Sequence, residues 1–252
     1  MPSFACLPTE IVHDIVDNLS SNTAALHSVA LINRLLLSSA RRHLFYTINL
    51  SSARLCTAFD SILRITSSLG SFVRALTLSE SGWLDATLPG TLIGPTLTSL
   101  RSLSLLHVDW TALSELTVAY LNTHFTILHT LELQHPVLQD WGDLVHLLSP
   151  RTRLHTLTIG RVRLRGPIRP PDRSGYGVAR GVRVLSTAGP SLHDSVDALL
   201  AWLPDLRPHT LRVQTIEDTH VLDVARLLRA QGTALGAFEM CTWAFHALAW
   251  QG

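Results

Sequence analysis

The sequence contains no lysine, few charged residues and few cysteines. All 20 basic residues are arginines, and charged residues of both signs make up only 15% of the 252 residues. Biased codon usage is the simpler explanation of the missing lysines. The formal net charge of +1 gives no overall attraction to nucleic acid or to anionic membranes. A hydrophobic content of 46% is ample for a folded core and excludes a chain that is disordered throughout.

Long apolar runs and paired cysteines are also missing. No stretch approaches the roughly 18 uninterrupted apolar residues that a membrane helix needs, and Glu10 interrupts the apolar residues near the N-terminus. A secretory signal is therefore not expected. The three cysteines, Cys6, Cys56 and Cys241, are far apart and form no C-x-x-C pair. Disulfides and a zinc site are both disfavoured, and we expect a reducing compartment: the cytoplasm, the nucleus or both.

A short pattern, apolar-x-x-apolar-x-apolar, recurs every 26 to 28 residues along most of the chain. Its second apolar residues are Ile48, Leu76, Leu103, Leu131, Leu157, Leu185, Leu211 and Phe238. A fixed period of this length is typical of stacked units in which a strand alternates with a return segment. Strands stack at about 4.8 Å whereas helices need about 10 Å, so the stack must curve. We predict an α/β fold: a curved leucine-rich-repeat solenoid of about eight strand–helix repeats over residues 46–252, with a parallel sheet on its concave side.

Apolar residues at helical spacing lie between most of the predicted strands. They predict helices over residues 53–69, 111–124, 138–148, 193–203 and 220–230.

Residues 1–45 do not share the repeat and are predicted to form a separate domain of three short helices. Pro8 and Glu10 suit a first helical turn, and Ile11, Ile15 and Leu19 then follow at spacings of four residues. Three such helices enclose little core. Their surplus apolar surface must therefore be covered by a partner or by the following domain.

These N-terminal residues resemble an F-box, in the form found in mushroom-forming fungi. The motif reads Leu7-Pro8-x-Glu10-Ile11-x-x-x-Ile15-x-x-x-Leu19, then Val29-Ala30-Leu31-Ile32-Asn33-Arg34, then Arg41-Arg42-His43-Leu44-Phe45. The resemblance covers roughly residues 4–50. This chain departs from the family at Leu36, where a tryptophan is usual.

The resemblance implies a substrate-receptor subunit of a Skp–cullin–F-box ubiquitin ligase. The helices then dock on the Skp adaptor and, through it, on a cullin, while the repeats hold a protein target. The residues expected at the adaptor contact are Leu7, Pro8, Ile11, Ile15, Leu19, Leu31 and Ile32. A receptor without lysine is a poor target for its own ligase, which is the second explanation of that absence. The alternative function is a leucine-rich-repeat interaction scaffold with no role in ubiquitin transfer.

The position just before the predicted strands is basic in six consecutive repeats. Its residues are Arg74, Arg101, His129, His155, Arg183 and His209. Stacking aligns them into a basic rail, which suits carboxylates or phosphate and makes them candidates for target binding. The alternative is an exposed position that merely tolerates basic residues. The columns facing the open side of the sheet are mostly Ala, Ser and Thr.

A second concentration of charge lies at residues 151–183, with nine arginines and the single acid Asp172. Glycines and prolines within it predict a loop over residues 160–181, either functional or merely solvated. Tyr176 is the one Phe, Tyr or Trp among these arginines, and no known binding motif accompanies them, so nucleic-acid binding is not expected. The chain has no G-x-S-x-G and no H-E-x-x-H, and its 13 histidines are scattered. We therefore expect no enzymatic activity, no metal and no cofactor.

Overall fold

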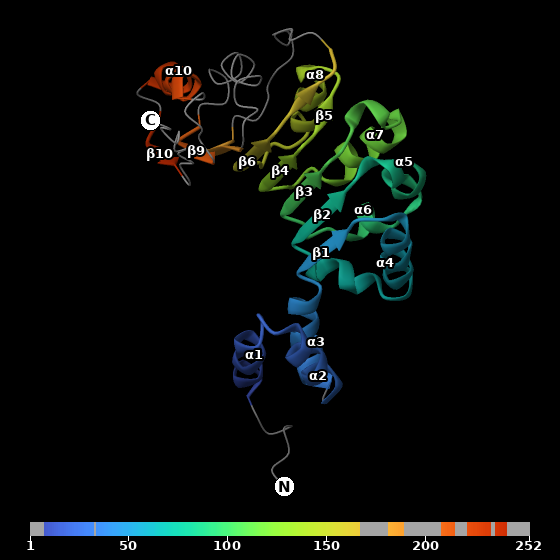
Figure 1. Ribbon diagram of the computed structural model, residues 1–252. Coiled ribbons are helices and arrows are strands. Elements are labelled where there is room, and N and C mark those ends of the chain that lie inside the picture. The colour runs from blue at the N-terminus through green and yellow to red at the C-terminus, as the bar shows by residue number, and fades with distance from the viewer. Residues whose placement is uncertain are drawn as a thin grey trace, which may run out of the picture.

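The computed structural model describes residues 8–32, 34–166, 181–188, 208–214, 221–232 and 235–240. Within these residues, three N-terminal helices precede an open parallel sheet of eight strands (Figure 1). The predicted α/β class, the three helices and the eight parallel strands are thus confirmed.

The N-terminal helices are α1 (Thr9–Asn18), α2 (Thr23–Ile32) and α3 (Arg34–Leu44). Pro8 stands at the cap position of α1, where its missing N–H costs no helical hydrogen bond. The helices share a small core of buried residues: Val12, Val16, Leu26, Leu36 and Ala40. This core is separate from the larger core under the sheet. The boundary between the two cores lies between Leu44, which packs on the core of the three helices, and Phe45, which packs on the core under the sheet.

Two polar contacts hold α1 against α3. The His43 Nε2 atom lies 2.6 Å from Asp17 Oδ1. The Ser39 hydroxyl lies 2.7 Å from His13 Nδ1. Together with Val12 and Val16, which are buried, these contacts fix which side of α1 faces inward.

The strands of the large sheet follow one another in chain order. They are β1 (Thr47–Leu50), β2 (Ala75–Ser79), β3 (Ser102–Leu106), β4 (Thr130–Gln134), β6 (Thr156–Gly160), β8 (Val184–Ala188), β9 (Thr210–Gln214) and β10 (Ala237–Met240). The second apolar residues of the repeated pattern pair directly across neighbouring strands, as Leu103 does with Leu76 and Leu131. The repeat therefore set the register correctly along the whole sheet, from Ile48 opposite Leu76 to Phe238 opposite Leu211.

Burial alternates along the strands as the pattern requires. In β2, Leu76 and Leu78 are buried, whereas Ala75 and Thr77 are only half-buried on the opposite face. Two positions differ from the prediction. Ser186 of β8, expected on the open face, is 3% exposed. Phe238 of β10, expected in the core, is 39% exposed, because β10 ends the sheet and has a neighbouring strand on one side only.

Helices cover one side of the sheet, with α4 to α8 together on that side in Figure 1. The predicted helices are present as α4 (Ala53–Ile65), α7 (Glu115–His124), α8 (Trp141–Leu148) and α10 (Val221–Gln231). The segment 193–203 lies outside the described residues. Ser52, Ser114 and Asp140 each cap a helix by accepting a hydrogen bond from a backbone N–H of its first turn.

Three helix boundaries were predicted wrongly. Residues 66–72 leave α4 and form the 3-10 helix η2 (Ser67–Phe72). Before α7 stands the 3-10 helix η5 (Trp110–Ala112), and before α8 the short strand β5 (Val137–Leu138). Only the caps at Ser114 and Asp140 mark where the α-helices begin.

Between β2 and β3 the chain makes four short helical pieces that the sequence did not predict. They are η3 (Ser81–Trp83), α5 (Leu84–Thr87), η4 (Leu88–Gly90) and α6 (Ile93–Thr96). Pro89 and Pro95 each remove a backbone donor, so no long helix forms here. Hydrogen bonds to neighbouring repeats replace the missing ones: Leu92 N–H donates to Asp60 Oδ1 at 2.6 Å, and Gly94 N–H donates to the Tyr120 hydroxyl at 2.6 Å.

A second, two-stranded parallel sheet joins β5 to β7 (Arg163–Leu164). The prediction of a loop over 160–181 is therefore wrong for its first residues, because Gly160 ends β6 and residues 163–164 form a strand. Arg165 then forms an ion pair with Asp109, at 2.7 Å between Nη2 and Oδ2. The rest of that loop, residues 167–180, lies outside the described residues.

Gly70 permits a close approach between two helical segments. A Cβ atom there meets the Thr96 carbonyl oxygen at 2.5 Å, and backbone cannot move as a side chain can. We expect Gly70→Ala to lower the free energy of unfolding by about 1–3 kcal/mol. Gly82→Ala is the matched control, since a Cβ there meets nothing within 4 Å. Urea unfolding of both variants tests this, and equal midpoints contradict it.

Candidate functional site

The three N-terminal helices expose large apolar side chains beside their small core. Ile11 is 45% exposed and Ile15 38% on α1, and Leu31 is 89% exposed and Ile32 62% on α2. Each helix thus exposes two large apolar side chains, and such side chains are candidates for contact with a partner. Four of the seven residues predicted at the adaptor contact are therefore available to a partner.

The other three predicted contact residues are Pro8, Leu19 and Leu7, and they differ from one another in exposure. Pro8 is exposed at the start of α1. Leu19 is half-buried and packs on the core of the three helices, so its role is largely structural. Leu7 lies outside the described residues. On α1, Ile11 and Ile15 alternate with the buried Val12 and Val16, which explains why sequence alone did not separate the two faces.

Leu36 is 3% exposed and belongs to the core of the three helices. The departure from the F-box pattern at this position therefore affects how the helices pack. It does not remove an exposed apolar side chain from the surface.

The six residues of the predicted basic rail are aligned by the backbone. The N–H groups of Arg101 and Ser102 both donate to the Arg74 carbonyl, at 2.8 and 2.9 Å. The same forked pattern repeats from His129 and Thr130 to the Arg101 carbonyl. It continues with His155 and Arg183 in the next repeats, and the Arg183 carbonyl accepts the Thr210 N–H at 2.8 Å, which keeps His209 in line. The structure thus brings all six into one column at the amino ends of the strands.

The side chains in this column are not equivalent. Arg101, His155, Arg183 and His209 are exposed, whereas Arg74 and His129 are half-buried. The Arg74 Nη1 atom donates to the carbonyl oxygens of Ser71, at 2.6 Å, and of Ser99, at 3.3 Å. The rings of His129 and His155 meet edge to face with centroids 5.4 Å apart. Arg74 is therefore held in place, while the exposed members are free to meet a ligand.

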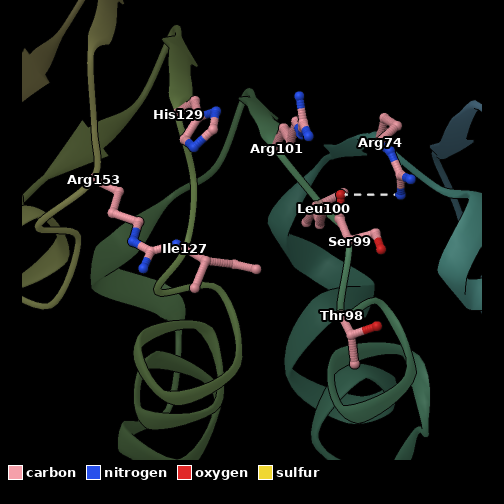
Figure 2. A pocket seen from close by; sticks show the side chains of 8 residues that line it. All are labelled: Arg74, Thr98, Ser99, Leu100, Arg101, Ile127, His129 and Arg153. Atoms are coloured by element: carbon pink, nitrogen blue, oxygen red, sulfur yellow. Dashed lines mark hydrogen bonds between the residues drawn. The ribbon is translucent and has the colours of Figure 1, made fainter.

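A pocket of about 240 Å³ opens at the start of this column. Figure 2 shows Arg153 and Arg74 on opposite sides of it, with His129 and Arg101 between them. The remaining lining residues are Thr98, Ser99, Leu100 and Ile127. Four basic side chains and no acidic one thus surround a single hollow. Its chemistry suits an anion.

Arg153 was predicted within the charged segment 151–183 and not as part of the rail. It reaches the pocket from the turn between α8 and β6. Arg151, from the same charged segment, does not contribute to the surface charge. Its side chain is 0% exposed and lies inside the fold.

A second column, at the opposite ends of the strands, was not predicted. Glu80, His107, His135 and Arg161 each follow a strand and have positive φ, from 49 to 68°. This conformation directs the His107 N–H to the Gln134 carbonyl and the His135 N–H to the Gly160 carbonyl. The rings of His107 and His135 stack, with centroids 4.5 Å apart. The sequence signal is a fixed offset, because each residue lies two positions after the last apolar residue of its repeat.

His135 makes stability depend on pH in a defined direction. Partial desolvation, followed by His107 and Arg161, lowers the pKa of His135 below 6.5. The folded protein then binds this proton less readily than the unfolded chain, so stability falls as pH drops through the unfolded pKa and below it. Asn also tolerates positive φ, so we expect His135→Asn to lose less stability than the parent between pH 7.5 and pH 5. Urea unfolding at both pH values measures the difference, and parallel losses contradict it.

Two observations concern the reactivity and the metal-binding capacity of the described residues. Burial, with a smaller contribution from Asp60, raises the pKa of the Cys56 thiol to about 11, so this thiol is protonated and unreactive at neutral pH. Within the described part of the chain, no three His, Cys, Asp or Glu side chains are grouped to hold a metal ion.

A second pocket, of about 410 Å³, lies between η5, α7 and α8. Its lining combines apolar residues such as Trp110 and Val118 with the acids Glu115 and Asp143. It lies on the helices and not at the strand ends that carry the basic rail. None of the predicted site residues lines it.

Two further findings concern the chain as a whole. None of the helices described for it is both long and apolar enough to cross a bilayer. In comparisons with known proteins, the chain matches no protein-family model and no curated protein sequence.

Proposed function

We propose that this chain is a substrate-receptor subunit of a Skp–cullin–F-box ubiquitin ligase. In this function α1, α2 and α3 form an F-box that binds the Skp adaptor and, through it, a cullin. The observation that carries the proposal is the exposure of Ile11, Leu31 and Ile32 beside a core of only five buried residues. Burying one such side chain contributes roughly 1.5–3 kcal/mol, so a partner that covers all three gains substantial affinity.

The remainder of the chain, in this proposal, is a curved leucine-rich-repeat solenoid with its sheet on the concave side. Support comes from strands in chain order at spacings of 26 to 28 residues and from helices on one side of the sheet (Figure 1). The open face carries small residues such as Ala75 and Thr77, which allow a target backbone to approach closely. The target is held there and at the basic rail.

No bond is made or broken by this chain in the proposed function. Holding the target near the ubiquitin-transferring subunits raises its effective concentration, and that accelerates transfer. The chain then acts in the cytoplasm, the nucleus or both, where the ligase is found.

Co-purification with a purified Skp adaptor tests the proposal. The full chain should retain the adaptor, and a Pro8→Ala, Ile11→Ala double variant should not, because it loses exposed contacts without opening the helix core. Leu116→Ala, which changes a 73% exposed leucine on α7, is the matched control and should bind as the parent does. No retention by the parent chain overturns the ligase assignment and favours the scaffold without a role in ubiquitin transfer.

A further inference from the structure

The pocket at the start of the basic rail carries positive charge that no lining acid neutralises. Arg74, Arg101, His129 and Arg153 line it, and none of its eight lining residues is acidic. They come from consecutive repeats: the first three directly precede β2, β3 and β4, and the fourth precedes β6. Like charges are brought together by the backbone ladder, and this arrangement is unfavourable unless an anion joins them.

Two of the guanidinium groups have no partner among the described residues. Neither the Arg101 nor the Arg153 side chain makes a hydrogen bond or an ion pair within that part of the chain, and both are exposed. Some other arginines pair with acids: Arg64 with Asp60, and Arg212 with Glu239 on the neighbouring strand. Arg101 and Arg153 differ from the other exposed arginines that have no acidic partner among the described residues, because they line one pocket together with Arg74 and His129.

The pocket is also partly preorganised. The bonds from Arg74 Nη1 to the Ser71 and Ser99 carbonyls fix one guanidinium at its edge and leave other N–H groups to donate. Thr98 and Ser99 add hydroxyl groups, and Leu100 and Ile127 add apolar surface. A donor that is fixed beforehand loses less entropy on binding.

The size and shape of the pocket limit its occupant. Its volume of about 240 Å³ is below the roughly 300–1,000 Å³ of pockets that enclose drug-sized ligands. A single guanidinium fork matches a carboxylate or a phosphate equally well, but a phosphoryl group has three acceptor oxygens and a carboxylate two, so a phosphoryl group can bind more of the guanidinium groups at once. We propose that this pocket binds the phosphorylated side chain of a serine or threonine in an extended protein segment.

A peptide fits the surroundings better than a nucleic acid does. No Phe, Tyr or Trp lines the pocket, so the His129 ring is the one lining side chain on which a base could stack, and the net charge of the chain is only +1. The neighbouring open face of the sheet carries small side chains such as Ser102 and Thr130, beside which an extended backbone can lie. The inference depends on the proposed function only in taking the target to be a protein.

The test uses the full chain without any adaptor. Inorganic phosphate is titrated against chloride at matched ionic strength, and the Nε–Hε resonances of Arg101 and Arg153 are followed by NMR. We expect saturating shifts in the millimolar range with phosphate only. A peptide library with a fixed phosphoserine should then be retained at least tenfold better than the same library with serine.

Two double variants decide whether the pocket is responsible. Arg101→Gln with Arg153→Gln should reduce retention of the phosphopeptides tenfold or more. Arg54→Gln with Arg163→Gln removes the same charge from two exposed arginines outside the pocket and should leave retention unchanged. All four side chains are exposed, so both proteins should fold, which their thermal unfolding checks.

Several results overturn the inference. They are shifts that do not saturate, equal retention of the two libraries, equal losses in both double variants, or tighter binding of single-stranded oligonucleotides through the same two arginines. Failure of the parent chain to retain the Skp adaptor is a separate result. It overturns the ligase assignment but does not contradict phosphate binding by this pocket.

Discussion

Arg151→Met is expected to lower the free energy of unfolding by about 2–4 kcal/mol. Arg151 is 0% exposed, and the described residues provide no acid to pair with it. Its guanidinium instead donates to the carbonyls of Leu147 and Leu121, and to the Asn122 side chain at 3.1 Å. These carbonyls belong to the last turns of α8 and α7, the negative ends of both helices.

One cation therefore satisfies two helix ends from consecutive repeats. Burial lowers the pKa of Arg151 to about 10, which still leaves the side chain protonated at neutral pH. Methionine matches the length of the arginine stem but donates no hydrogen bond. The Leu147 carbonyl then loses this donor, and the Leu121 carbonyl keeps only the bond from the Phe125 N–H, at 3.4 Å. A buried carbonyl left without a partner costs roughly 1–3 kcal/mol.

Urea unfolding followed by circular dichroism measures this effect. Arg153→Met is the matched control, because the same change two residues away affects an exposed side chain and should alter stability by less than about 0.5 kcal/mol. Similar midpoints for the two variants contradict the structural role given to Arg151.

Leu31→Asp is expected to weaken adaptor binding by about 30- to 1,000-fold, which corresponds to roughly 2–4 kcal/mol for a residue at the centre of an interface. Leu31 is 89% exposed on α2, so a charge there does not enter the helix core. It does place a carboxylate beside Ile32 on the part of α2 that is proposed to meet the adaptor. An apolar partner surface must then desolvate that charge without compensation.

Calorimetric titration of the purified chain with the Skp adaptor gives the dissociation constant. Leu116→Asp on α7 is the control, since it introduces the same change at another exposed leucine of the chain. Its affinity should equal that of the parent. An unchanged affinity for Leu31→Asp removes α2 from the proposed interface, and an equal loss in both variants points to a general effect of charge.

The sheet could be predicted from the sequence because one side-chain pattern encodes both strand position and register. Once Leu76, Leu103 and Leu131 occupy equivalent places, hydrogen bonding between parallel strands leaves a single alignment that buries all of them. The rail could be predicted for the same reason. Arg74, Arg101 and His129 stand at a fixed offset from those leucines, so the register places them in one column.

The features that could not be predicted depend on contacts that do not recur from one repeat to the next. Arg151 lies in a segment rich in arginine, and only the positions of two helix ends explain why it is buried. The segment between β2 and β3 lacks a helical repeat because prolines divide it. The faces of α1 could not be separated, because isoleucine and valine are equally suited to a core and to an interface.

The column of positive φ values was missed for a different reason. Glycine and asparagine are the usual signals of this conformation, and here the positions hold Glu80, His107, His135 and Arg161. Glu80, His107 and His135 donate backbone hydrogen bonds to the next strand, and these bonds compensate for the strain. Only comparison of one repeat with the next reveals the common offset.

In the sheet each strand is bonded only to the strands immediately before and after it in the chain. Duplication or deletion of one whole unit of about 27 residues would therefore leave every other junction with a partner of the same shape. The length of the recognition surface can change over evolutionary time while the N-terminal helices stay as they are. Such a gene could acquire new specificity by changing its number of units, without redesigning its attachment to other proteins.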